Sequence, residues 1–90
     1  MSERRFVITG LVQGVWYRGG MVAKAEELGL TGWVRNRRDG SVEAVVSGSD
    51  AQIAAILDWA RNGPRGARVD HVAVEPAEGR YSGFVQRPTV

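Results

Sequence analysis

Cysteine is absent from this 90-residue chain, and His71 is its only histidine. The lack of cysteine excludes disulfides, thiolate nucleophiles and cysteine-ligated metals. A single histidine argues against a histidine-based metal site or a Ser–His–Asp triad. No apolar run approaches the roughly 18 residues that cross a bilayer, and Met1–Arg5 leads into an alternating segment and not into the long apolar segment of a secretory signal. We therefore expect a cytoplasmic protein with no cofactor, no metal and no membrane partner.

The rest of the composition is that of one small globular domain spanning residues 1–90. Hydrophobic residues make up 43% of the chain and charged residues 24%, and the length is too short for two independent cores. Because Lys24 is the only lysine, eleven of the twelve basic residues are arginine, which suits bidentate recognition of carboxylate and phosphate. A net charge of +2 is a weak footprint for nucleic acid, so no nucleic-acid partner is expected.

Alternating apolar residues and glycine interruptions predict the elements of the first half of the chain. Arg5–Val12 is apolar on both faces, which favours an interior strand. Gln13–Gly20 contains three glycines and predicts a loop. Apolar residues then recur at helical spacing from Met21 to Leu28, and Gly29 is expected to end that helix.

The second half predicts a hairpin, a helix and further strands. Ser49 and Gln52 have capping-box spacing ahead of an apolar stripe that ends at Asn62-Gly63-Pro64. The expected strands are Leu30–Arg37, Ser41–Gly48, Val69–Glu75 and a short terminal one within Arg80–Gln86, with Asp39 in the hairpin turn. The order β-α-β-β-α-β predicts an α+β, ferredoxin-like sandwich, in which both helices cover one face of an antiparallel sheet.

The first candidate site is the segment Gly10-Leu-Val-Gln-Gly-Val-Trp-Tyr-Arg18, which joins a strand to a helix. Successive backbone N–H groups in such a loop can converge on an anion, and the helix N-terminus adds partial positive charge. Arg18 could close over the anion with two parallel hydrogen bonds. A glycine-rich turn with a surface arginine is the alternative, and spacing alone leaves the two open.

The second candidate is Asn36, near the end of the second predicted strand. Its amide can donate to one group and accept from another, which suits it to holding a water against an electrophile. The alternative is an asparagine that satisfies a turn backbone. Arg35 and Arg37 are expected on one side of the strand, either solvated or raising the potential for an anionic substrate. His71 lies outside both segments and is expected to be structural.

Together these segments resemble the two signatures of the acylphosphatase family. The first is Gly10–Arg18, and the second is Gly32-Trp-Val-Arg-Asn36 followed by Gly40-Ser-Val42 and Gly48. The resemblance implies hydrolysis of the carboxyl–phosphate bond of acyl phosphates without a metal. Arg18 and the loop amides would bind the phosphate, and Asn36 would position the attacking water. The loop positions implied in phosphate binding are Gln13, Gly14, Val15, Trp16, Tyr17 and Arg18.

Several expectations about ligands and alternatives follow from the resemblance. The substrate is a small acyl phosphate, inorganic phosphate or sulfate competes with it, and the protein is a monomer. Many members of the family have Ser or Thr after the arginine; here Gly19-Gly20-Met21 follows, which predicts a less rigid loop. The alternative function is a catalytically weak or inactive anion-binding module. Trp16 is either a wall beside the substrate or a partly exposed aromatic.

Overall fold

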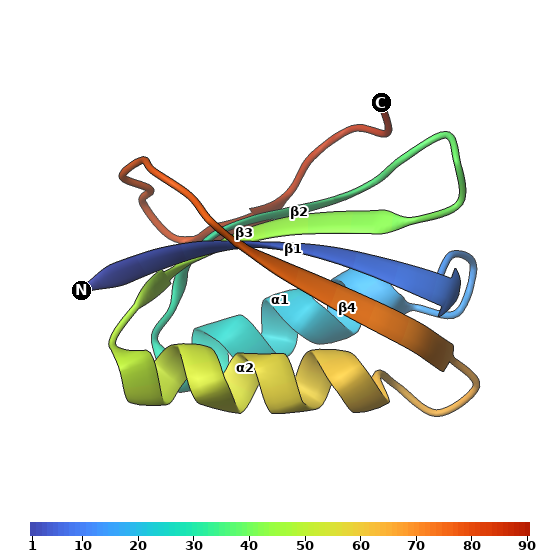
Figure 1. The fold of residues 1–90 in the computed structure, drawn as a ribbon, viewed down its shortest axis with the longest axis horizontal. Coiled ribbons are helices and arrows are strands. Elements are labelled where there is room, and N and C mark those ends of the chain that lie inside the picture. Colours follow the sequence, from blue (N-terminus) through green and yellow to red (C-terminus); the bar gives the residue numbers. More distant parts are fainter.

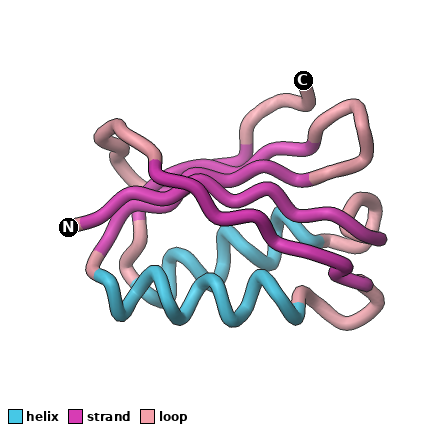
Figure 2. The backbone as a smooth tube through the Cα atoms, viewed as in Figure 1, coloured by secondary structure: helices cyan, strands magenta, loops and turns pink.

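A twisted five-stranded sheet packs one of its faces against two helices in the computed structural model, which describes residues 1–90 (Figure 1). The sheet and the helix pair form two layers, and loops gather at the two ends of the sheet (Figure 2). The elements are β1 (Ser2–Leu11), α1 (Tyr17–Leu28), β2 (Thr31–Asn36), β3 (Val42–Gly48), α2 (Asp50–Asn62), β4 (Arg68–Pro76) and β5 (Phe84–Gln86). This is the α+β, βαββαβ arrangement that the sequence predicts.

The strand order is β4-β1-β3-β2-β5, so β1 is an interior strand as expected. Neighbouring strands are antiparallel except for β2 and β5, which pair in parallel over three residues. The expectation of a fully antiparallel sheet is therefore wrong at this edge. The chain reverses after β4 and crosses to the far edge of the sheet, so β5 runs in the same direction as β2. The short terminal strand expected within Arg80–Gln86 is present and begins at Phe84.

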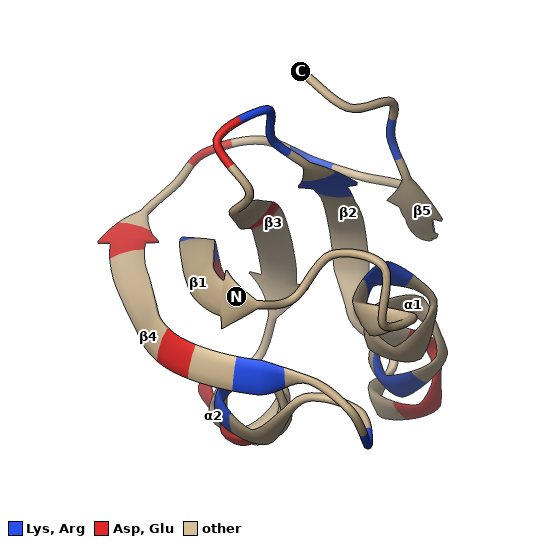
Figure 3. Cartoon of the chain, turned by 90° about the vertical axis from the view of Figure 1, so that its right-hand side faces the viewer, with Lys and Arg blue, Asp and Glu red and all other residues tan.

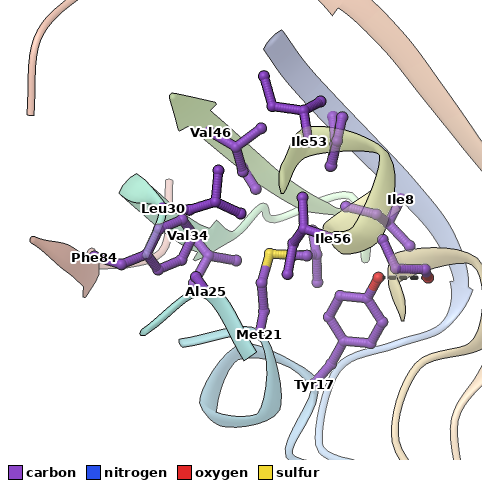
Figure 4. Packing of buried hydrophobic residues seen from close by; sticks show 14 of the residues in the cluster. Ile8, Tyr17, Met21, Ala25, Leu30, Val34, Val46, Ile53, Ile56 and Phe84 are labelled. Carbon is purple, nitrogen blue, oxygen red and sulfur yellow. Dashed lines mark hydrogen bonds between the residues drawn. The ribbon is translucent and has the colours of Figure 1, made fainter. Parts of the chain in front are cut away.

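The hydrophobic core lies between the sheet and the helices (Figure 4). Alternate residues of each strand face the helices, because strand side chains point to opposite faces with a period of two. Completely buried members of the core come from five elements: Phe6 and Ile8 of β1, Met21 and Ala25 of α1, Val34 of β2, Val42, Ala44 and Val46 of β3, and Ile56 and Ala60 of α2. None of the helices is long and apolar enough to cross a membrane.

The predicted N-terminus of α2 agrees with the structure, whereas that of α1 does not. At α2 the capping box is confirmed: the Gln52 amide donates to the Ser49 hydroxyl at 3.1 Å, and the Ser49 amide donates to the Gln52 side chain at 2.7 Å. Helix α1 begins at Tyr17 and not at Met21, so the prediction of a loop through Gly20 is wrong. Arg18 therefore lies in the first helical turn, where backbone N–H groups have no intrahelical acceptor.

The face of the sheet away from the helices carries a buried charge cluster. The Glu43 carboxylate is 7% exposed and accepts hydrogen bonds from Arg5 of β1 and from Arg35 of β2, the latter at 2.7 Å. Burial raises the pKa of Glu43, but the hydrogen bonds from Arg35 and Arg5 outweigh burial and hold this pKa below its usual value. The guanidinium groups of Arg35 and Arg87 each lie 4.7 Å from the centroid of the Trp33 ring. This cluster fixes β1, β2 and β3 relative to one another.

Candidate active site

One end of the sheet brings both candidate segments together. Strands β1 and β2 are both antiparallel to β3, so they run in the same direction and end on the same side of the molecule. A pocket with a volume of about 130 Å³ lies there, which is roughly four times the volume of a water molecule in the liquid. Its lining residues are Val12, Gly14, Trp16, Tyr17, Arg18, Gly19, Asn36 and Gln86.

The loop between β1 and α1 has an alternating backbone. Gly14 has φ +75° and Trp16 has φ +61°, whereas φ of Val15 between them is not positive. Alternation of this kind turns successive N–H groups toward one concave side, as in an anion-binding nest. The amides of residues 13–19 donate no hydrogen bond to any protein group, and the helix has neither a side-chain cap nor an acidic residue in its first turn. The loop therefore presents a run of free donors.

Arg18 adds a full positive charge to these partial ones. It lies in the first turn of α1, is half-buried and lines the pocket. The six ion pairs of the protein involve other residues, and no protein group accepts a hydrogen bond from the Arg18 side chain. Its guanidinium is thus available to an anion that enters the pocket.

Asn36 reaches the pocket because of strand alternation. On β2, Gly32, Val34 and Asn36 share the face that is turned toward the helices, and Asn36 is the last residue of the strand. It therefore lies beyond the core, beside the first turn of α1. Its Oδ1 atom is buried and has no hydrogen-bond partner in the protein. A buried acceptor without a partner is costly, and such atoms mark positions where a ligand or water is bound.

The side chain of Gln13 points away from the anion site and ties the loop to the β2–β3 hairpin. Its Nε2 atom donates to the carbonyl oxygens of Arg37 and Ser41, at 2.7 and 2.9 Å. Neither Gln13 nor Val15 lines the pocket, and Val15 packs against the core. The Gln13 amide therefore holds the loop beside the strand end that carries Asn36.

Tyr17 is the most deeply buried of the predicted loop residues. It is 1% exposed, and its hydroxyl donates to the carbonyl oxygen of Ala60 at 2.7 Å (Figure 4). Its ring lies 5.2 Å from that of Trp59. Burial raises the pKa of Tyr17 well above its usual value. The side chain therefore anchors the start of α1 to α2, and its hydroxyl proton is donated to the Ala60 carbonyl oxygen.

Other basic residues lie at the same end of the molecule as the pocket. Figure 3 looks at this end of the molecule and shows basic positions on the β2–β3 hairpin and at the start of α1. Arg35 pairs with Glu43, so it does not act as a free charge. Arg37 lies 3.9 Å from Asp39, whose carboxylate accepts from the Ser41 hydroxyl and amide. These hydrogen bonds lower the pKa of Asp39 and confirm it as the turn residue.

Two residues that line the pocket, Gly19 and Gln86, lie outside the predicted site segments. Gln86 is the last residue of β5 and lies beside Val34 in the parallel pair, on the same face as the buried Phe84. No local signal marks it, because its place depends on a three-residue pairing between distant segments. His71 lies on β4, outside this pocket and exposed. No three His, Asp or Glu side chains come together in a way that could hold a metal ion.

Several known proteins with a similar sequence and fold are acylphosphatases. The acylphosphatase family model matches residues 4–86. An acylphosphatase of Albidiferax ferrireducens is 57% identical over 83 residues, which are 92% of this chain and 90% of that protein. One of Thiobacillus denitrificans is 56% identical over 87 residues, covering 97% and 98% of the two chains. The crystal structure of the Bacillus subtilis acylphosphatase superposes with a TM-score of 0.92 at 28% identity, over 97% of this chain and 99% of that one.

Proposed function

This chain belongs to the acylphosphatase family and is an enzyme that hydrolyses acyl phosphates, and on that premise we propose which of its groups act on the substrate. Backbone amides of the loop and of the first turn of α1, with Arg18, bind the phosphoryl group, and Asn36 holds the attacking water. The observation that carries this proposal is the run of unpartnered amides over residues 13–19, beside an arginine without an ion pair. Such donors are stable in a folded protein when an anion completes their hydrogen bonds.

Binding and catalysis use the same donors in this proposal. Charge in phosphoryl transfer is spread over the three equatorial oxygens of the phosphoryl group, so catalysis consists mainly of positioning and of electrostatic stabilisation. Fixed amides, a helix N-terminus and the Arg18 guanidinium are already arranged around the pocket. They need little reorganisation as the bond to the leaving group breaks, which is the condition for efficient stabilisation of the transition state.

The attacking water is held by Asn36. The buried Oδ1 atom accepts a hydrogen bond from the water and thereby gains its missing partner. The water oxygen bonds to phosphorus, the bond between phosphorus and the acyl oxygen breaks, and the carboxylate leaves with that electron pair. The lining residues of the pocket include no Asp, Glu or His. We therefore assign the water proton to a phosphate oxygen of the substrate, so that the products are a carboxylate and inorganic phosphate.

An acyl phosphate is an activated mixed anhydride with a good leaving group. Its carboxylate needs no protonation in order to leave, so a pocket without a general acid is sufficient. The reaction as written also needs no metal, because Arg18 and the amides supply the positive charge near the phosphoryl oxygens. The second candidate, an inactive anion-binding module, would share the phosphate site and differ only in turnover.

The test compares Arg18→Gln with Arg80→Gln. Arg80 lines a separate depression with Met1 and Thr31, where β1 and β2 begin, so the control removes the same charge at the opposite end of the sheet. Arg18→Gln should lower kcat/KM for an acyl phosphate by about 10²–10³ and weaken competitive inhibition by inorganic phosphate. Arg80→Gln should behave as the wild type. Phosphate inhibition that is unchanged in Arg18→Gln would show that Arg18 is not in the binding site, and phosphate binding without turnover in the wild type would favour the inactive module.

A further inference from the structure

Trp16 combines an unusual backbone with an exposed side chain. It is the only non-glycine residue with positive φ, and its left-handed conformation immediately precedes α1. Its side chain is large and apolar, yet the residue is 69% exposed. A left-handed backbone is unfavourable for such a residue, and conformations of this kind gather at functional sites.

The absence of side chains at the two glycines after Arg18 leaves space for tryptophan rings beside the first turn of α1. A Cβ atom on Gly19 would lie 2.3 Å from Trp16 Nε1, whereas one on Gly20 would lie 2.8 Å from Trp59 Cζ2 and 3.5 Å from Trp16 Cζ3. Neither glycine has positive φ, so backbone conformation does not require them. Gly19 therefore lets the Trp16 indole lie against the first turn of α1, and Gly20 makes room chiefly for Trp59. The rest of the Trp16 side chain is exposed to solvent.

The indole separates two neighbouring depressions. On one side is the phosphate pocket with Arg18 and Asn36, which Trp16 lines. On the other side a shallow groove of about 310 Å³ runs between α1 and α2. Its lining residues are Trp16, Gly20, Ala23, Lys24, Glu27, Trp59 and Pro64. Because Trp16 belongs to both, a ligand in the pocket can extend over the indole into the groove.

We propose that the exposed face of Trp16 is the platform for the acyl group, and that this enzyme prefers acyl phosphates with a flat aromatic acyl group. This inference rests on the proposed function, since it places the phosphoryl group between Arg18 and Asn36. The attacking and leaving oxygens must lie roughly in line through phosphorus. Asn36 comes from the sheet side of the pocket, whereas Trp16 and the groove belong to the helix side. The acyl group leaves toward the helices.

The chemistry of the groove favours an uncharged acyl group. Aromatic rings gain stability from offset or edge-to-face contact with another ring, and Trp16 offers a free ring face. The two charges of the groove, Lys24 and Glu27, pair with each other at 3.4 Å. They therefore provide no net charge that would select a second carboxylate or phosphate on the substrate. Trp59 and Pro64 extend the apolar surface beyond the indole.

The test compares benzoyl phosphate with acetyl phosphate in wild type, Trp16→Asn and Trp16→Phe. Asparagine tolerates the left-handed conformation, so Trp16→Asn removes the ring with little strain on the loop. The measured quantity is the ratio of kcat/KM for benzoyl to acetyl phosphate. We expect this ratio to fall about 3- to 10-fold in Trp16→Asn, as expected for the loss of one aromatic pair, and to be kept in Trp16→Phe.

A second readout uses the wild-type protein. The probes are benzoylphosphonate and acetylphosphonate, whose carbon–phosphorus bond is not hydrolysed by this route. At equal occupancy, benzoylphosphonate should quench tryptophan emission more than acetylphosphonate does. Trp16→Phe should remove that difference. A ratio that is unchanged in Trp16→Asn, or equal losses for both substrates, would overturn the acyl platform and leave the proposed function standing. Failure of Arg18→Gln to weaken phosphate inhibition would instead contradict the proposed function itself.

Discussion

Replacement of Asn36 by alanine should separate catalysis from both phosphate binding and folding. Asn36 is assigned to the water and not to the phosphate, so its loss should lower kcat and leave phosphate inhibition close to that of the wild type. Removal of one well-placed hydrogen-bonding group of this kind costs about 10²–10³ in kcat, or roughly 3–4 kcal/mol of transition-state stabilisation.

The stability of the same variant provides an independent check. Most substitutions of a half-buried polar residue remove a hydrogen bond and destabilise the fold. Here the Asn36 Oδ1 atom makes no hydrogen bond to the protein, so Asn36→Ala breaks none. The free energy of unfolding of Asn36→Ala should therefore stay close to that of the wild type.

Steady-state kinetics with an acyl phosphate, phosphate inhibition and urea unfolding measure these three effects. Asn36→Asp is the matched variant, because it keeps the size of the side chain but places a carboxylate in an anion pocket. It should lose phosphate affinity through charge repulsion as well as turnover. A near-normal kcat for Asn36→Ala would refute the water-positioning role. If Asn36→Ala loses phosphate affinity to the same extent as kcat, Asn36 belongs to the phosphate-binding site and not to the water site.

Three further predictions concern metals, anions and acid. Hydrolysis should continue in EDTA after exhaustive dialysis, because the proposed reaction needs no metal; activity that disappears and returns with one divalent cation would contradict it. Phosphate or sulfate at about 100 times its Kd should add roughly 2.7 kcal/mol to the free energy of unfolding, beyond a chloride control of equal ionic strength, and no added stability would count against a preformed site. Glu43→Gln should destabilise the protein at neutral pH by about 1–3 kcal/mol, since two arginines lose their partner. Because the folded pKa of Glu43 is held below the usual 4.5, its contribution is full above that pH and is lost as pH falls through the folded pKa. Acid unfolding below about pH 4.5 should therefore be shallower in Glu43→Gln than in the wild type, and an identical pH profile would contradict the ion-pair assignment.

Local signals predicted those features that local contacts determine. The Ser49–Gln52 capping box lies within one turn, and both of its hydrogen bonds form. Asp39 accepts from the backbone two residues on, which is the bond that makes it a turn residue. The alternation of side chains along β2 places Asn36 on the same face of the sheet as Val34. Because the helices cover that face, the position of Asn36 beside the pocket follows from the strand pattern.

Features that depend on distant contacts could not be predicted. The glycines at 19 and 20 indicate a loop, yet both residues are helical, and a side chain is excluded there by the rings of Trp16 and Trp59. Glu43 looks like the polar residue of an alternating strand, but the strand register places Arg35 directly opposite it. Gln86 enters the pocket only through the parallel pairing of β5 with β2. Each of these depends on a segment that is remote in sequence.

A phosphate titration followed by backbone amide NMR tests the central assignment most directly. In this assignment the phosphate site is built from the free amides of residues 13–19. Phosphate binding should therefore change the amide proton signals of these residues more than those of the rest of the chain. Inorganic phosphate should shift the signals of Gly14, Val15, Trp16, Arg18 and Gly19 downfield in a saturable way and slow their exchange with solvent. Arg18→Gln should need more phosphate to reach the same shifts. Saturable shifts confined to the β2–β3 hairpin, or no shifts over residues 13–19, would contradict a phosphate site in this loop.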